Sequence, residues 1–427
     1  MIDLKSYCII TYGCTFNQGD SLKIEKILGD YGFIKENLNN ADLVILNTCA
    51  VKLSTESKIL NYISHIIQKF PFKYYIITGC LPQIDKKIYN NIERMIFDKG
   101  FILNIQDIPN LLNILYKNEK IRHNLPNYKE KSNIIPKINS KSPISIIQIS
   151  EGCNNSCSYC CTTNARGDLR SFDSKLIIKQ FKILISQGIK EFHITSQDLG
   201  NYDHEGKKLH HLLKEISLLK GSVHFRLGMI NPDYFTKFNS EFHQIFEDKR
   251  FYRFLHIPIQ SGSNKILKKM KRHYKIEDVD SIFLKLKEYD KLFRIGTDII
   301  VGFPSELEED YDQTENFVKK WKPSIVNISK YTVRPNTEAK GFQQLKSQII
   351  KKRSKKLSMI FSNYSEILNK QWNGWEGEVF YNEYRENVQF PFMGRNLYYM
   401  PVLSKEAVVG QTKDVKITGY LNHSLIG

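Results

Sequence analysis

Four of the eight cysteines stand close together in the run EGCNNSCSYCC, residues 151–161. Cys153, Cys157 and Cys160 have the spacing C-x3-C-x2-C. Three thiolates on one tight loop can bind three irons of a cubane [4Fe–4S] cluster and leave the fourth iron without a protein ligand. A metal with an open coordination position can bind a substrate or cofactor, so the spacing predicts a catalytic cluster rather than a structural one.

Two other interpretations of this run are weaker. Cys161 cannot easily join Cys160 on one cubane, because adjacent side chains point in different directions. A zinc site would need paired C-x2-C units or nearby histidines, and no histidine lies between residues 123 and 193. Chance placement of four cysteines in a reduced protein is the remaining alternative, and the regular spacing argues against it.

Three further cysteines each follow a predicted strand. Cys14 comes after SYCIITYG, Cys49 ends ADLVILNTC and Cys80 ends KYYIITGC. Helical stretches separate these runs, and strands alternating with helices indicate a parallel sheet whose carboxyl ends share one edge. We therefore expect Cys14, Cys49 and Cys80 to converge on one site. Cys8 lies inside the first strand, where a small buried cysteine is the ordinary interpretation.

The predicted strands and helices that would position these cysteines divide the chain into three parts, with a linker between the first and the second. The predicted fold class is α/β. Residues 1–120 form a doubly wound parallel-sheet domain, and the polar segment 121–142 is the linker. Residues 143–370 contain six strand-like runs with helices between them, which predict a complete or partial βα barrel with its active site at the carboxyl ends of the strands. Residues 371–427 are short strands with Gly and Asn turns, typical of a small all-β barrel.

The charge balance favours a polyanionic partner. The chain has 62 Lys and Arg against 45 Asp and Glu, a formal net charge of +17, and nucleic acid is the first candidate. A lysine-rich composition imposed by an AT-rich genome is the alternative. The basic run KKRSKK at 351–356 is either a solvated helix face or an RNA contact. No apolar run is long enough for a bilayer span and no signal peptide is evident, so we expect a cytoplasmic protein without membrane attachment.

Beyond the cysteine spacing, several motifs resemble a known family. CxxxCxxC after the first strand of a βα barrel resembles the radical S-adenosylmethionine superfamily. TYGCTFNQGDS, LNTCAVK and TGCLPQ resemble the amino-terminal cysteine motifs of methylthiotransferases. ARGDLRS, ITSQDLG, LGMINP, IPIQSGSNKILKKMKRHY and GTDIIVGFPSELEEDY resemble that family's barrel segments, in order. The carboxyl-terminal part is similar to the TRAM (OB-like) domain, an RNA-binding module, so the resemblance covers nearly the whole chain.

The resemblance implies two [4Fe–4S] clusters and S-adenosylmethionine as cofactors. Cys153, Cys157 and Cys160 would be the catalytic ligands of the cluster that cleaves S-adenosylmethionine to a 5′-deoxyadenosyl radical. Cys14, Cys49 and Cys80 would hold an auxiliary cluster that carries the sulfur to be inserted. One S-adenosylmethionine would methylate that sulfur, and the radical from a second would take the hydrogen from adenine C2 before the methylthio group is transferred.

Within the family, TYGCTFNQGDS and LGMINP look most like the archaeal and eukaryotic branch. That branch converts N6-threonylcarbamoyladenosine beside the tRNA anticodon to its 2-methylthio derivative. The implied partners are the anticodon stem-loop and an electron donor such as ferredoxin or flavodoxin, with the enzyme a monomer. Two departures from the family pattern concern loop geometry: CTTNARG lacks the usual proline, and Cys161 is unexpected.

Polar residues after the barrel strands are candidates for binding S-adenosylmethionine through its adenosine, ribose or amino group. They are Gln197, Asp198, Gln260, Ser261 and Asp298. Arg226 is a candidate for binding a cofactor or substrate carboxylate at the barrel mouth, and Arg166 for meeting a carboxylate or phosphate. Ordinary strand-end hydrogen bonding or surface placement is the alternative for each.

Three other functions remain open. The chain could methylthiolate N6-isopentenyladenosine in tRNA, or an aspartate of a ribosomal protein. A non-catalytic RNA-binding protein with structural metal sites is the third. Two complete cysteine triplets argue against this last function, since a purely structural site would normally be fully ligated.

Overall fold

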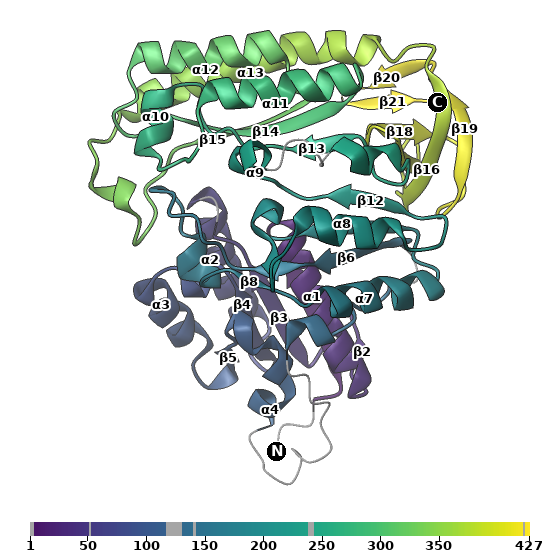
Figure 1. Cartoon of the computed structure of the whole chain (residues 1–427). Coiled ribbons are helices and arrows are strands. Elements are labelled where there is room, and N and C mark those ends of the chain that lie inside the picture. Colours follow the sequence, from purple (N-terminus) through teal and green to yellow (C-terminus); the bar gives the residue numbers. More distant parts are fainter. Residues whose placement is uncertain (1–3, 51–52, 117–129, 140–141, 238–242, 422) are drawn as a thin grey trace.

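Strands and helices alternate along most of the chain, as the hydrophobic pattern predicts (Figure 1). The structure is a computed structural model that describes residues 4–50, 53–116, 130–139, 142–237, 243–421 and 423–427. The amino-terminal part lies below the barrel in the view of Figure 1, and the carboxyl-terminal strands pack at one end of the barrel. Within the described residues, no helix is both long enough and apolar enough to cross a bilayer.

The amino-terminal part is a five-stranded parallel sheet in the order β2-β1-β3-β4-β5. Side chains of β3 alternate between two cores, so that Leu43 and Ile45 face α1 and α4 while Val44 and Leu46 face α2 and α3. Because both faces are covered, the central strand β3 is buried throughout. The doubly wound sheet predicted for this region is confirmed. The elements are β1 (Ser6–Thr11), α1 (Thr15–Asp30), β2 (Ile34–Lys35), β3 (Leu43–Thr48), α2 (Leu53–Lys69), β4 (Tyr74–Gly79), α3 (Lys86–Ile96), β5 (Gly100–Ile102) and α4 (Leu111–Leu115).

The central part is an open barrel of six parallel strands. Two three-stranded sheets, β6-β9-β12 and β13-β14-β15, are joined by the single bridges Phe225–Phe251 and Met229–His256. One large apolar core fills the space between the strands and their outer helices. The partial barrel is therefore confirmed.

The strands of the central part are β6 (Ile144–Gln148), β7 (Ser150–Glu151), β8 (Arg170–Ser171), β9 (Glu191–Thr195), β10 (Asp203–His204), β11 (Lys207–Lys208), β12 (His224–Leu227), β13 (Phe254–His256), β14 (Arg294–Val301) and β15 (Ile325–Lys330). The helices are α6 (Thr162–Arg166), α7 (Ser174–Ser186), α8 (Leu209–Ser217), α9 (Pro232–Lys237), α10 (Asn264–Lys269), α11 (Ile276–Tyr289), α12 (Glu308–Trp321) and α13 (Ser347–Lys370).

The carboxyl-terminal part is all-β, as predicted. Its strands pair in the order β19-β16-β17-β18-β21-β20 around a small core that includes Trp372, Tyr381 and Met400. The strands are β16 (Glu376–Tyr384), β17 (Phe392–Asn396), β18 (Pro401–Ser404), β19 (Thr412–Lys416), β20 (Gly419–Leu421) and β21 (Ser424–Ile426).

The segment predicted as a linker, 121–142, is described only at 130–139 and 142. There it packs against both neighbouring parts instead of bridging them in solvent. Lys131 is completely buried and forms ion pairs with Asp20 of α1 (3.2 Å) and Glu151 of β7 (2.7 Å). A buried ammonium group is tolerated only when it is paired, so this segment helps to fix the sheet domain against the barrel.

Candidate active site

The parallel sheet brings Cys14, Cys49 and Cys80 together at its carboxyl edge. Thr48 pairs with Gly79 at the ends of β3 and β4, and the amide of Cys80 donates to the carbonyl of Thr48 (2.9 Å). A Cβ built on Gly13 would lie 3.1 Å from Cys49 Sγ, so the loop that carries Cys14 packs directly on Cys49. The convergence expected from the three strand ends is thus seen in the structure.

Asn17, in the first turn of α1, lies beneath these thiols. Its Nδ2 donates to the carbonyls of Tyr12 (3.0 Å) and Thr48 (2.8 Å), which ties two of the cysteine loops together. Its Oδ1 lies 3.8 Å from Cys14 Sγ and 3.9 Å from Cys80 Sγ. Asn17 therefore shapes the loops around the cysteine group.

Arg166 connects this group with the other cysteine run. It ends α6, which begins directly after Cys161, and its Nε donates to Cys80 Sγ (3.4 Å). Its Nη2 donates to Asn17 Oδ1 (2.7 Å), and its Nη1 donates to Asp20 (2.7 Å) and Glu151 (2.9 Å). Of the two alternatives for Arg166, a carboxylate contact is therefore correct, and the side chain is buried between the two domains.

Asp20, Glu151, Lys131 and Arg166 form a buried network of two anions and two cations. Burial alone would raise the pKa of Asp20, but the guanidinium of Arg166 and the ammonium of Lys131 outweigh it and hold the pKa at about 2. Lys23 is also buried, and desolvation together with the charge of Lys131 lowers its pKa to about 7. The network is therefore close to electroneutral above this pH.

The second triplet lies on the loop between β7 and α6. The amide of Asn155 donates to Cys153 Sγ (3.4 Å), and the amide of Thr162 donates to Cys160 Sγ (3.4 Å). Arg272 Nη1 donates to Cys157 Sγ (3.3 Å). Each sulfur of this triplet thus accepts a hydrogen bond from nitrogen.

Arg272 was not identified from the sequence. It lies in the turn between α10 and α11, 115 positions after Cys157. Its Nη2 donates to Asn231 Oδ1, and Asn231 donates in turn to Asp198. The matched segment KMKRHY is the only sequence signal that includes it, and nothing in that segment indicates a contact with sulfur.

The two cysteine groups fit iron–sulfur ligation. Burial raises the pKa of Cys153 to about 12 and the pKa values of Cys160 and Cys80 to about 11. Such thiols lose their protons when a cationic metal centre replaces them. Among the described residues, no three His, Cys, Asp or Glu side chains are arranged around a single ion. Thiolates on a cubane bind different irons and therefore lie further apart than the ligands of one ion.

Cys161 points away from the second triplet. Its side chain is buried in the apolar core beneath α2 and α3, and its Sγ lies 3.9 Å from the carbonyl oxygen of Ala50. This orientation agrees with the expectation that Cys160 and Cys161 do not bind the same cubane. Cys161 instead joins the barrel loop to the sheet domain, next to Cys49.

Two of the polar residues predicted at the barrel edge contact the cysteine loop. Gln197 Oε1 accepts from the amide of Gly152 (2.8 Å), and Asp198 Oδ2 accepts from Asn155 Nδ2 (3.2 Å). Asp198 is buried, and desolvation raises its pKa despite hydrogen bonds from the backbone and side chain of Asn231.

The other predicted residues lie further from the cysteines. Asp298 Oδ1 interacts with His256 Nε2 (3.0 Å) and Asn327 Nδ2 (2.8 Å) inside the barrel, and the amide of Gln260 donates to the Asp298 carbonyl (2.8 Å). Ser261 is buried against Thr314 of α12 (3.4 Å), outside the strand ring. Arg226 lies level with Phe254, the first residue of β13, and is not among the residues around the cysteines.

The basic run 351–356 lies in α13 and divides in two. Arg353 is buried and bonds to Glu306 (2.6 Å) and Glu308 (2.8 Å), so it holds α13 to the start of α12. The lysines at 351, 352, 355 and 356 are exposed. Of this run, only the lysines are exposed, and Lys356 is paired with Glu315 (2.7 Å).

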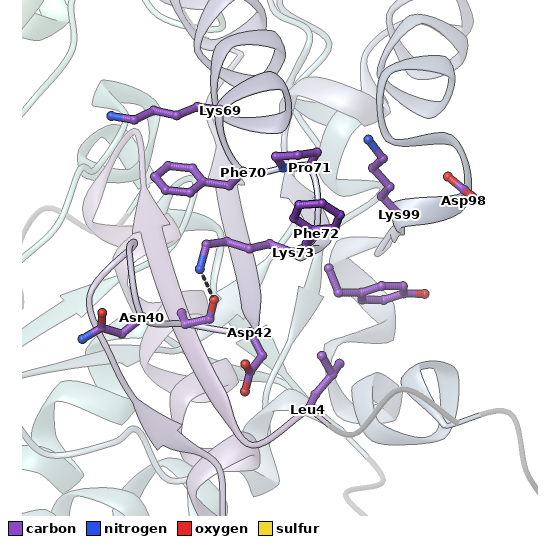
Figure 2. Close-up of a pocket in the computed structure, with 12 residues that line it drawn as sticks. Leu4, Asn40, Asp42, Lys69, Phe70, Pro71, Phe72, Lys73, Asp98 and Lys99 are labelled. Atoms are coloured by element: carbon purple, nitrogen blue, oxygen red, sulfur yellow. Dashed lines mark hydrogen bonds between the residues drawn. The ribbon is translucent and has the colours of Figure 1, made fainter.

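The cavity drawn in Figure 2 lies elsewhere. It measures about 710 Å³ and is lined by residues at the amino ends of β3 and β4, including Asp42, Phe70 and Lys73. Lys73 donates to the carbonyl of Ala41 there. Because the cysteines are at the carboxyl ends of the same strands, this cavity is on the opposite edge of the sheet and does not belong to the candidate site.

Family models match the two cysteine-bearing parts separately. Residues 147–318 match the Radical SAM superfamily, and residues 6–97 match the Uncharacterized protein family UPF0004. The fold is similar to a solved radical S-adenosylmethionine methyltransferase, TsrM from Kitasatospora setae, with a TM-score of 0.56 and 12% identity over 91% of this chain and 79% of that one. Members of this superfamily use S-adenosylmethionine and a [4Fe–4S] cluster.

Relatives that match nearly the whole chain identify its family within the superfamily. The human "Threonylcarbamoyladenosine tRNA methylthiotransferase" is 32% identical over 435 residues, which cover 98% of this chain and 73% of the human protein. A Methanothermobacter thermautotrophicus protein named "Probable threonylcarbamoyladenosine tRNA methylthiotransferase" is 32% identical over 414 residues, 96% of each chain. The chain therefore belongs to the threonylcarbamoyladenosine tRNA methylthiotransferase family of radical S-adenosylmethionine enzymes.

Proposed function

We propose that this enzyme converts N6-threonylcarbamoyladenosine beside the tRNA anticodon to 2-methylthio-N6-threonylcarbamoyladenosine. The observation that carries the proposal is the contact between Arg166 and Cys80 (3.4 Å). Arg166 follows Cys160 by six positions, so the two cysteine groups are neighbours across one side chain. A reaction that inserts sulfur where a hydrogen has been removed needs two such centres close to one substrate atom.

In this proposal each triplet holds a [4Fe–4S] cluster. Residues 1–120 provide Cys14, Cys49 and Cys80 for the auxiliary cluster, and residues 143–370 provide Cys153, Cys157 and Cys160. Bound there, the clusters and S-adenosylmethionine supply the radical, the sulfur and the methyl group, chemistry that no acid–base side chain provides at an aromatic C–H bond. Arg166 and Arg272 stabilise the sulfur ligands by hydrogen bonding.

The polar residues of the barrel edge would position S-adenosylmethionine. Asp198 is the foremost candidate because it is buried beside the cysteine loop. Its carboxylate accepts hydrogen bonds from Asn155, Asn201 and Asn231. Gln197, Gln260 and Asp298 would contact the adenosine or ribose. Ser261 would act indirectly, since its hydroxyl is directed at Thr314.

RNA binding fits the charge and the carboxyl-terminal part. The net charge of +17 and the exposed lysines of α13 provide cationic surface for phosphates. Tyr384 is 54% exposed on β16 and packs beside Phe392 (5.2 Å), an arrangement on which a base can stack. We infer that 371–427 act as a TRAM module, that the enzyme works as a cytoplasmic monomer and that a ferredoxin or flavodoxin supplies electrons.

Mass spectrometry of tRNA nucleosides from cells with and without the gene tests the function. Loss of the 2-methylthio nucleoside, with accumulation of N6-threonylcarbamoyladenosine, is the expected result on deletion. Unchanged levels would show that the proposal is wrong. Anaerobic reconstitution should give about eight irons per chain, and about four in a Cys49→Ala or a Cys157→Ala variant.

A further inference from the structure

The base of the barrel contains more positive than negative charge. On β12, Phe225 and Leu227 are buried in the core beneath the helices, whereas Arg226 faces the inside of the barrel. On β14, Ile295 and Ile299 face the core and Arg294 faces inward in the same way. Phe254 pairs with Arg294, and the Cζ atom of Arg226 lies 5.7 Å from the centre of the Phe254 ring.

The carboxyl-terminal part closes this end of the barrel with Tyr399. Tyr399 adopts φ +56° in the turn between β17 and β18, and its ring stacks on Phe254 with centres 5.5 Å apart. The guanidinium of Arg395, on β17, lies 4.7 Å from the Tyr399 ring and that of Arg226 lies 5.7 Å from it. Two arginines from two strands therefore lie against the Tyr399 ring, and the guanidinium of Arg294 lies 5.9 Å from the centre of the neighbouring Phe254 ring.

Only one of these arginines has its hydrogen-bonding needs met by the protein. Arg294 Nη1 donates to the carbonyl of Tyr399 (2.8 Å). Throughout the described part of the chain, neither Arg226 nor Arg395 finds a hydrogen-bond acceptor or a carboxylate partner, and Arg226 Nε is fully enclosed without one. Burial lowers the pKa of Arg294 to about 9, and the charge of Arg395 lowers it further in the same direction.

The nearest carboxylate does not neutralise them. Glu191 is completely buried, and its oxygens accept from His193 Nε2 (2.8 Å), Asn382 Nδ2 (2.6 Å) and Tyr252 OH (3.1 Å). This one carboxylate already accepts three hydrogen bonds, and the charges of two guanidinium groups, those of Arg226 and Arg395, act on it. An excess of buried cationic charge is costly unless an anion is bound, so this arrangement suits an anionic ligand.

We propose that Arg226 and Arg395 bind the free carboxylate of the threonylcarbamoyl group on the substrate adenosine. The proposal rests on the proposed function and adds a reason for its selectivity, since an isopentenyl group carries no charge. Five residues separate Arg226 from Asn231, which contacts Arg272 beside Cys157. β12 ends at Leu227, so at about 3.3 Å per residue these five steps span at most about 16 Å, a span comparable with the length of a modified adenine.

Two anticodon stem-loops test this assignment on the holoenzyme. One carries N6-threonylcarbamoyladenosine, and the other carries the same group with its carboxylate converted to a primary amide. The unaltered enzyme should methylthiolate the carboxylate form with a kcat/KM roughly 10- to 100-fold higher, the usual value of a charge-assisted hydrogen bond. Arg226→Gln and Arg395→Gln should each lower kcat/KM for the carboxylate form and leave the amide form within about threefold.

Arg250→Gln is the matched control. Arg250 is half-buried near Phe225, but its guanidinium is already bonded to Asp248 and to the carbonyls of Ser217 and Leu219. Its substitution should change both substrates by the same factor. Iron content and the visible spectrum of each variant report whether the clusters are intact, and Arg226→Lys, which retains the charge, should recover part of the preference.

Three results would overturn the assignment. Equal kcat/KM for the two RNAs with the unaltered enzyme would overturn it without the use of any variant. Equal losses on both RNAs in Arg226→Gln and Arg395→Gln would show a purely structural role. Failure of the unaltered enzyme to methylthiolate either RNA would overturn the proposed function and this assignment together, a result readily distinguished from loss of preference alone.

Discussion

Substitution of Arg166 is the most direct test of how the two cysteine groups are held together. Arg166→Met retains most of the side-chain volume but removes a buried charge that bonds to Asp20, Glu151 and Asn17 at 2.7–2.9 Å. Removal of one member of a buried ion pair typically costs about 3–5 kcal/mol, because the opposite charge remains buried without its partner. Asp20 and Glu151 are only 1% and 2% exposed, so solvent cannot replace the guanidinium.

The measurement is urea-induced unfolding of the reduced chain before cluster reconstitution, followed by circular dichroism. We expect Arg166→Met to lower the unfolding free energy by about 4 kcal/mol. Combining it with Asp20→Asn removes one anion as well and leaves the pair of Lys131 and Glu151 intact. The double variant should therefore be more stable than the sum of the single losses predicts, by about 2 kcal/mol.

Lys26→Met, on α1 like Asp20, is the control. Lys26 forms an ion pair with Asp30 one turn away, but both side chains are about one-third exposed, and such pairs contribute less than about 1 kcal/mol. If Arg166→Met costs no more than Lys26→Met, or if the Asp20 and Arg166 substitutions are additive, the buried network does not stabilise the domain contact and the reasoning fails.

Three further predictions concern the same site. The pKa of Asp20 in the folded protein, about 2, lies below its usual value of 3.8. The ionised carboxylate therefore contributes about 2 kcal/mol to the unfolding free energy above pH 4, and this contribution is lost as the pH falls through 2. Urea unfolding measured at a series of acidic pH values should show this dependence in the unaltered chain and not in Asp20→Asn. Gly79→Ala should lower the unfolding free energy by at least about 2 kcal/mol and reduce the iron bound by the auxiliary triplet, because its Cβ would lie 2.2 Å from the Thr48 carbonyl oxygen at φ +92°. Gly188→Ala has the same φ in open space and should lower the unfolding free energy by only about 1 kcal/mol. Urea unfolding measures both changes. Arg272→Gln should retain iron roughly 10- to 100-fold less well against a chelator, with Arg272→Lys intermediate, and equal retention would remove its role at Cys157.

The cysteine groups could be predicted because their positions follow from local patterns. An apolar run followed by a loop places each of Cys14, Cys49 and Cys80 at a strand end, and parallel pairing then places the three ends on one edge. The opposite orientation of Cys161 also follows from chain geometry. Alternating strands and helices likewise suffice to predict the two α/β parts, because periodicity depends on neighbouring residues alone.

Side chains whose partners are distant in sequence could not be predicted. Lys131 reaches Asp20 across 111 positions, and Arg166 reaches it across 146. A polar segment such as 121–142 has the composition of a solvated linker, and nothing local distinguishes an ammonium group that will be buried against two carboxylates. Arg226 was expected at the barrel mouth for a related reason. The sequence predicts the strand that carries it, but not how far along the barrel axis that strand lies relative to its neighbours.

The buried network has a consequence for how the two reaction centres can move. Its members come from α1, the segment 130–139, β7 and α6. The Asp20–Arg166 pair joins the sheet domain directly to the barrel loop, and Lys131, on the connecting segment, pairs with Asp20 on one side and Glu151 on the other. Separation of the two parts would break the Asp20–Arg166 pair and one of the two ion pairs of Lys131, a far larger cost than the opening of an apolar contact. Arg166 also bonds to Cys80 and follows Cys160 in the same short loop, so the distance between the two cysteine groups is set by a few short bonds. We therefore expect selectivity to come from groups away from the two cysteine groups, such as the arginines proposed to bind the substrate at the base of the barrel.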